Sequence, residues 1–159
     1  MDEQNVNGDS KTQGRYQVLG EFIGKARLEA IDAFIDFAAT HAKKRQFTDE
    51  RTDEMARVLK EALANIITYT FGGEPGEISL SCNLDKFGKF VLAIVDSGKP
   101  FNMLLEDDPF IGALDARSDA SGPTTKIIKR FSSNIEYKRL ENKNHLIITL
   151  ARDMKRGRE

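Results

Sequence analysis

The segment FVLAIVDSGKPFN at residues 90–102 joins a continuous apolar run to an abrupt polar end. An apolar run such as 90–95 is expected of a central strand that is buried on both faces or nearly so. Apolar residues alternate with polar ones through 77–84, which predicts a second strand, and residues 85–88 form its hairpin turn. The sequence therefore predicts an antiparallel pair at the centre of a sheet.

Further strands and helices follow on either side of this pair. Residues 16–23 form a strand candidate, and 135–140 with 145–150 predict a hairpin across 141–144. We expect three helices, each marked by apolar residues at helical spacing: one that Gly24 opens (Leu28, Ile31, Phe34, Ile35, Ala38), one capped by Thr48 and ending near Tyr69 (Met55, Val58, Leu59, Ala62, Leu63, Ile66), and a short one with Pro123 in its first turn (Thr124, Ile127, Ile128, Phe131).

This mixed order of helices and hairpins predicts an α+β fold, a two-layer sandwich with a mainly antiparallel sheet covered by helices on one face. We expect one domain at 15–151, a disordered polar tail at 1–14 and a charged tail at 152–159. Residues 102–122 lack periodicity and predict a long loop.

Composition excludes several classes of chemistry. The chain has 159 residues, 24 Lys and Arg, 25 Asp and Glu, two His and one Cys, with a net charge of −1. A zinc cluster or a disulfide scaffold needs more ligands or pairs. A Ser-His-Asp or Cys-His site would depend on His41 or His145, and we expect neither in a pocket. Near-zero charge argues against a general nucleic-acid binder. With neither a signal peptide nor a membrane span in view, we expect a cytoplasmic protein.

A basic run, Lys43, Lys44 and Arg45, falls at the end of the first expected helix. Cations suit the negative end of a helix, so a solvated helix end is one interpretation. The other is a contact with an acidic partner. The run alone does not separate the two.

Glu61 and Asn65 lie four residues apart, so they share a helix face that differs from the apolar one. The carboxylate can take a proton or orient a water, and the amide oxygen can coordinate Mg²⁺. The plain alternative is two polar side chains near a helix end.

Two glycine-containing turns complete the candidate set. Asp96 ends the central strand, where its carboxylate can accept a hydrogen bond from an amino group such as adenine N6, and Gly98 lets a flat ring approach the backbone. The Ser121-Gly122-Pro123-Thr124 segment opens the short helix, and helix N-termini with glycine can bind phosphates. An ordinary turn and an ordinary helix start are the alternatives.

Taken in this order, the three motifs resemble the anti-sigma-factor protein serine kinases of the gyrase/histidine-kinase/MutL ATPase superfamily, which have the Bergerat fold. The resemblance covers about residues 16–150. The stretch from Glu61 to Asn65 looks like the family's N-box, and the stretch from Val95 to Asn102 looks like its first glycine box. The hairpin of 135–150 is similar to the family's last two strands.

The resemblance implies a role for each matched residue. Asp96 would bind the adenine amino group, with Gly98 and Phe101 beside the ring, and Asn65 would hold Mg²⁺. Glu61 would act as the general base or orient the attacking hydroxyl. Residues 102–121 would form a lid over ATP, with Gly122 and Thr124 near the phosphates. In such kinases the substrate is a serine of a STAS-type antagonist, and the kinase also silences a sigma factor, commonly as a homodimer.

The sequence departs from the family at two places. Tyr69 and Thr70 stand where the family usually has His-Ala. The second glycine box, normally G-x-G, aligns with Gly122-Pro123-Thr124, so one glycine is lost and Pro123 has no N–H for a phosphate. Two functions remain open: an ATP-dependent serine/threonine kinase, or a catalytically inactive module that sequesters a partner. In neither do we expect membrane or direct nucleic-acid contact.

Overall fold

The computed structural model describes residues 16–107 and 123–153. The elements in them are β1 (Gln17–Lys25), η1 (Leu28–Ala30), α2 (Ile31–Lys44), α3 (Asp49–Asn65), η2 (Ile66–Phe71), β2 (Glu77–Leu84), β3 (Phe90–Asp96), η3 (Met103–Asp107), α5 (Lys126–Phe131), β4 (Asn134–Leu140) and β5 (Lys143–Leu150). The expected tail at 1–14, the end of the expected tail at 154–159, the lid residues 108–121 and Gly122 lie outside the described residues.

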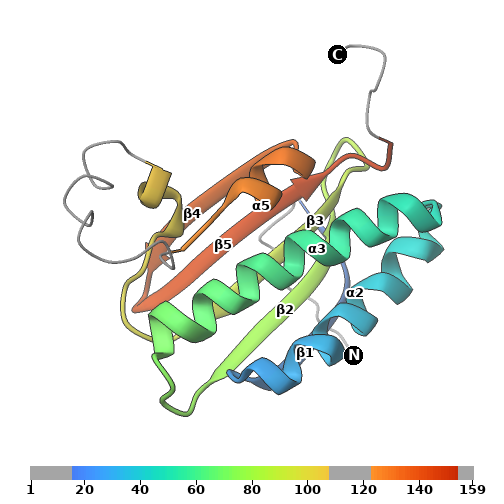
Figure 1. The fold of residues 1–159 in the computed structure, drawn as a ribbon. Helices are drawn as coiled ribbons and strands as arrows, with labels where there is room; N and C mark the ends of the chain where they lie inside the picture. Colours follow the sequence, from blue (N-terminus) through green and yellow to red (C-terminus); the bar gives the residue numbers. More distant parts are fainter. Residues whose placement is uncertain (1–15, 108–122, 154–159) are drawn as a thin grey trace.

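The five strands form one sheet in the order β1-β2-β3-β5-β4, and every neighbouring pair is antiparallel. Helices α2, α3 and α5 lie together on one face of this sheet (Figure 1). The expected two-layer α+β sandwich is confirmed. β3 is the middle strand, which explains why residues 90–95 are apolar throughout.

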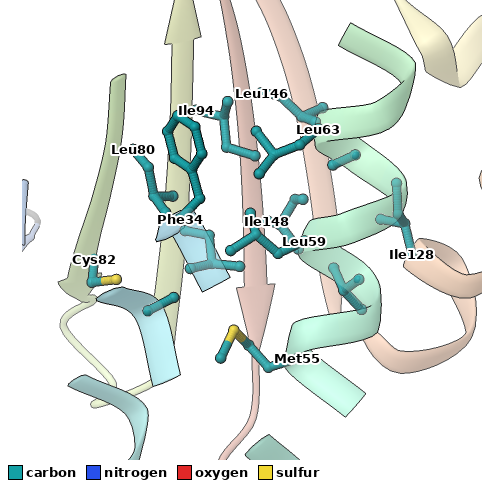
Figure 2. Packing of buried hydrophobic residues seen from close by; sticks show 14 of the residues in the cluster. Phe34, Met55, Leu59, Leu63, Leu80, Cys82, Ile94, Ile128, Leu146 and Ile148 are labelled. Carbon is teal, nitrogen blue, oxygen red and sulfur yellow. The ribbon is translucent and has the colours of Figure 1, made fainter. Parts of the chain in front are cut away.

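The core lies between the helix layer and the sheet. Leu59 and Leu63 of α3 point towards Ile148 and Leu146 of β5, and Phe34 of α2 lies nearer β2 and β3 (Figure 2). Fully burying a side chain of this size stabilises the fold by about 1.5–3 kcal/mol. These contacts fix α3 over the centre of the sheet, and α3 carries two of the expected site residues.

Helix α3 begins as the sequence predicts. The Thr48 side chain accepts a hydrogen bond from Arg51 N at 3.0 Å and so caps the helix. The helix continues directly into the π-helical segment η2. This segment ends at Gly72, whose φ of 56° lies in the left-handed region. Within the described residues, no helix is both long enough and apolar enough to cross a membrane.

The expected start of the first helix is wrong. Gly24 lies in β1, and a Cβ there would come within 2.7 Å of the Phe34 ring, so the glycine makes room for core packing. Leu28 is 58% exposed and lies in η1, outside the core. Helix α2 starts at Ile31, because the chain first has to leave the edge strand and turn back onto the sheet.

The last hairpin has a tighter turn than the sequence predicts. Glu141 and Asn142 have φ values of 54° and 64°, as in a two-residue turn between antiparallel strands. Asn144, expected in the turn, therefore lies within β5 and pairs with Asp96 of β3. This register brings an amide next to the carboxylate at the end of the central strand.

Candidate functional site

Asp96 is the last residue of β3 and is only 4% exposed. Its Oδ1 accepts hydrogen bonds from Gly98 N at 2.9 Å and from Asn144 Nδ2 at 3.0 Å. Burial raises the pKa of Asp96, while these two hydrogen bonds and the nearby charge of Arg139 oppose the rise. The carboxylate is thus held in one orientation.

Gly98 has no space for a side chain. A Cβ at this position would collide with Thr70 Cγ2 and lie 3.2 Å from the Phe71 ring, both on η2. The glycine is therefore required by close packing of the 96–101 loop against η2. Arg139 of β4 donates from Nη1 to Gly98 O at 2.8 Å and holds the loop from the other side.

Asn144 connects this loop to the last hairpin. Its Nδ2 donates to Asp96 and to Lys99 O at 2.8 Å. Its Oδ1 accepts from three donors: Tyr137 Oη at 2.6 Å, Arg139 Nη1 at 3.2 Å and Phe101 N at 3.3 Å. Because the partners of Oδ1 are donors and the partners of Nδ2 are acceptors, the orientation of the Asn144 amide is defined. Asn144 is 4% exposed, so the network is also shielded from water.

Thr70 lies in the wall that packs on Gly98. Its hydroxyl oxygen is buried and has no hydrogen-bond partner within the described parts of the chain. A buried hydroxyl without a partner is unfavourable unless a water or a ligand supplies one. This orphaned group and the Asp96 carboxylate flank the same glycine.

Phe101 is held at the end of the 96–101 loop by an aromatic contact. Its ring stacks on Tyr69 of η2, with 5.7 Å between the ring centroids and 22° between the ring planes. The pair lines the junction between the loop and the helix layer. Tyr69 is one of the two positions where the sequence departs from the resembled family.

Glu61 and Asn65 both face α5 and the segment before it. Asn65 is buried, and its Nδ2 donates to Thr124 O at 2.9 Å and to Met103 Sδ at 3.5 Å. Glu61 Oε1 accepts from Ile128 N at 2.9 Å, in the first turn of α5, and so caps that helix. The structure thus brings the two residues together, but both already have partners from distant parts of the chain.

The start of α5 differs from the expected one. The first helical residue is Lys126, so Pro123 precedes the helix instead of occupying its first turn. Thr124 Oγ1 accepts from Lys126 N at 3.5 Å, the upper limit of a hydrogen bond. At this helix start Glu61 of α3 supplies a side-chain acceptor, through the hydrogen bond from Ile128 N. Gly122 lies outside the described residues.

The residues of thiol and imidazole chemistry lie elsewhere. Cys82 is buried in β2, and burial raises its pKa to about 12. The His41 ring packs edge-on against Phe37, with 4.8 Å between the ring centroids. His145 follows Asn144 in β5 and therefore points to the other face of the sheet. Burial lowers the pKa of both imidazoles.

Sequence reasoning missed Asn144, Tyr137, Arg139 and Thr70. The two strand residues lie on the helix-facing side of β4 in an alternating burial pattern, which gives a weak signal for them. Asn144 was not assigned to the site because the predicted turn, 141–144, is two residues longer than the observed one and includes Asn144. Thr70 was marked only as a departure from the resembled family, because its contact with Gly98 depends on the packing of η2 on the 96–101 loop.

The comparisons with known proteins agree with this architecture. Residues 24–150 match the family model described as the histidine kinase-like ATPase domain. No curated protein matches the chain. The match spans most of the chain and covers α3, the end of β3 and the last hairpin. The chain therefore belongs to the histidine kinase-like ATPase domain family, within the gyrase/histidine-kinase/MutL superfamily.

Proposed function

We propose that this protein binds ATP with Mg²⁺ and uses the bound state to control a protein partner, as the anti-sigma-factor serine kinases that it resembles do. The main support is the Asp96 carboxylate, which is buried at the end of the central strand and fixed through Oδ1. Its second oxygen is then the acceptor for the exocyclic amino group of adenine. A buried ionisable acceptor of fixed direction is suited to reading one amino group.

Two neighbouring features fit an adenine ring. Gly98 lets the 96–101 loop pack closely on η2, which holds the Asp96 carboxylate and Thr70 beside each other. The buried Thr70 hydroxyl needs a partner, and a water on the base or a ring nitrogen would provide it. The Asp96 carboxylate, an acceptor, and the Thr70 hydroxyl would then meet the same edge of the base.

Asn65 and Glu61 fit the other end of a nucleotide. Asn65 uses its NH₂ group for Thr124 O, which makes its amide oxygen the atom that a cation would bind. Mg²⁺ commonly takes one or two protein ligands and completes its shell with phosphates and water. Mg-ATP, when bound, supplies the phosphoryl group and neutralises its developing charge. Glu61 would then hold the attacking hydroxyl of the partner.

A second candidate function is favoured by the contact between Glu61 and α5. With Oε1 engaged by Ile128 N, Glu61 has a structural role at that helix. Pro123 also lacks the N–H that a phosphate cradle would use. Both observations favour a module that binds a nucleotide and sequesters its partner without phosphoryl transfer. The partner in either case would be a STAS-type antagonist or a sigma factor, with this chain acting as a homodimer.

Calorimetric titration with ATP, with and without Mg²⁺, tests the shared part of both proposals. We expect binding that strengthens with Mg²⁺. Titrations without heat in either condition, repeated at a second temperature, would rule out nucleotide binding.

Transfer of labelled phosphate from ATP to a STAS-type protein separates the kinase from the inactive module. In the kinase, transfer is measurable and falls in Glu61→Gln. In the inactive module, no transfer occurs although ATP binds. Transfer that is equal in the wild type and Glu61→Gln would refute the role that we give to Glu61.

A further inference from the structure

A groove of about 770 Å³ lies at the opposite end of the sheet from Asp96. It runs between the end of α2, the β2–β3 hairpin and the residues after β5, which meet at one end of the molecule (Figure 1). Phe90 in its wall and Asp96 are the two ends of β3, so about 20 Å separate the groove from the proposed nucleotide site. The groove is thus a separate feature of the fold.

Cations from three distant parts of the chain line this groove. Lys44 and Arg45 come from the end of α2, Lys89 from the hairpin and Arg152 from the segment after β5. One carboxylate, Asp153, also lines it, and it pairs with Arg152 at 3.3 Å. Four cations and one carboxylate give the lining a charge of +3, in a chain whose net charge is −1. A helix end alone accounts for the α2 residues only.

Phe87 supplies an exposed aromatic surface beside these charges, and two buried rings, Phe47 and Phe90, also line the groove. Phe47 and Phe90 pack on each other, with ring centroids 5.2 Å apart. Phe87, at the hairpin, is 76% exposed and also lines the groove. An exposed aromatic ring beside a concave surface is typical of a site that takes an apolar anchor from a protein partner.

The walls of the groove are held in place from below. Arg51 is buried and donates to Ala151 O at 3.0 Å and to Phe131 O at 2.9 Å, which fixes the end of β5 against α3. Gln46 takes a left-handed φ of 74°, and Phe47 N donates to Ala42 O at 3.1 Å, so the α2–α3 turn is tight. A groove with fixed walls loses little conformational entropy when it is filled.

We propose that this groove docks an acidic segment of a protein partner, one that carries an aromatic or large aliphatic residue among its carboxylates. Positive charge on the rim and the exposed Phe87 ring favour this occupant, because a polyanion without apolar groups would make no contact with Phe87. The proposal concerns partner docking only and does not depend on ATP binding. Two residues of the basic run, Lys44 and Arg45, would then contact the acidic partner, while Lys43 lies outside the groove and pairs with Asp49 at 3.6 Å.

The test uses the full chain and a fluorescein-labelled twelve-residue peptide of alternating Asp and Glu with two Phe and one Leu. Fluorescence anisotropy should show binding that weakens with salt. Arg45→Glu with Lys89→Glu should raise the Kd at least tenfold. A matched control, Lys60→Glu with Lys138→Glu, makes the same change of charge at exposed positions outside the groove and should leave the Kd within twofold.

Two further arms decide the chemistry. A peptide with Asn and Gln in place of the carboxylates, and one with Ala in place of the apolar residues, should each bind at least tenfold more weakly. Equal binding by either peptide, an equal Kd in the groove variant, or tighter binding of a single-stranded oligonucleotide than of the acidic peptide would overturn the proposal. ATP titration of the same groove variant should match the wild type, so that failure here is distinct from failure of the nucleotide site.

Discussion

Replacing Asp96 by Asn tests the proposed base recognition at a single atom. In the wild type, Oδ1 accepts from Gly98 N and Asn144 Nδ2. In Asp96→Asn the amide oxygen has to stay with these two donors, because the amide nitrogen cannot accept from them. The NH₂ group then points to where the adenine amino group would lie, and two donors face each other.

The expected loss follows from this change of polarity. A hydrogen bond to a charged group contributes about 1.5–3 kcal/mol, and leaving a buried donor without an acceptor costs about 1–3 kcal/mol. We take about 3 kcal/mol as the sum that survives partial relaxation, which is a roughly 150-fold rise in the Kd for ATP. GTP carries an acceptor, O6, where adenine carries its amino group, so its affinity should fall much less or rise.

Calorimetric titration of both proteins with ATP and GTP measures this reversal. An ATP affinity within threefold of the wild type in Asp96→Asn would refute the assignment of Asp96 to the base. Unfolding of both proteins, measured as a function of pH, shows whether the variant folds. Because burial raises the pKa of Asp96 above its ordinary 3.8, the folded state holds a proton that the unfolded state has lost. The free energy of unfolding of the wild type should therefore fall as the pH rises from 3.8 to the raised pKa of folded Asp96. In Asp96→Asn this pH-dependent contribution should be absent.

Three other substitutions should have distinct effects. Gly98→Ala should destabilise the fold by about 2 kcal/mol and weaken ATP binding, since its Cβ collides with Thr70; urea unfolding and titration measure both. Arg51→Met should cost about 3 kcal/mol in urea unfolding, because it leaves two backbone carbonyls and the partly buried Glu54 carboxylate without their donor. Glu61→Gln should keep the bond to Ile128 N and change stability by under about 0.5 kcal/mol, while any phosphoryl transfer falls roughly 100-fold. Unchanged stability in either of the first two, or undiminished transfer in the third, would contradict these expectations.

Local patterns were enough for most of the fold. The alternation in 77–84 and the apolar run in 90–95 located β2 and β3, and the Thr48 cap located α3. The errors arose where tertiary packing overrides a local signal. Gly24 resembles a helix start in sequence, but in the fold it is a gap in an edge strand that the Phe34 ring fills. The residues next to Gly24 in the sequence do not indicate this contact, because it forms only when α2 packs on the sheet.

The candidate site was predictable in its residues and less so in their contacts. Glu61, Asn65 and Asp96 were named from motif spacing, and the fold brings each of them towards the same end of the sheet. Their partners come from far along the chain: Glu61 contacts Ile128, and Asp96 contacts Asn144. Such pairs depend on strand register and on how α5 lies against α3. A two-residue error in one turn was enough to hide Asn144.

The separation of the site into two halves bears on how its activities could diverge. The proposed base-recognition half is built on the sheet, where Asp96 and Asn144 are neighbours across β3 and β5. The proposed phosphate half depends on the helix layer, where Glu61 and Asn65 contact α5 and the segment before it. Because β3 and β5 are fixed by the core, base recognition can persist while the contacts around α5 change. If Asp96 reads the base as we propose, phosphoryl transfer can be lost at Pro123 and Glu61 while nucleotide binding persists, so the titration and the transfer assay need not give the same answer.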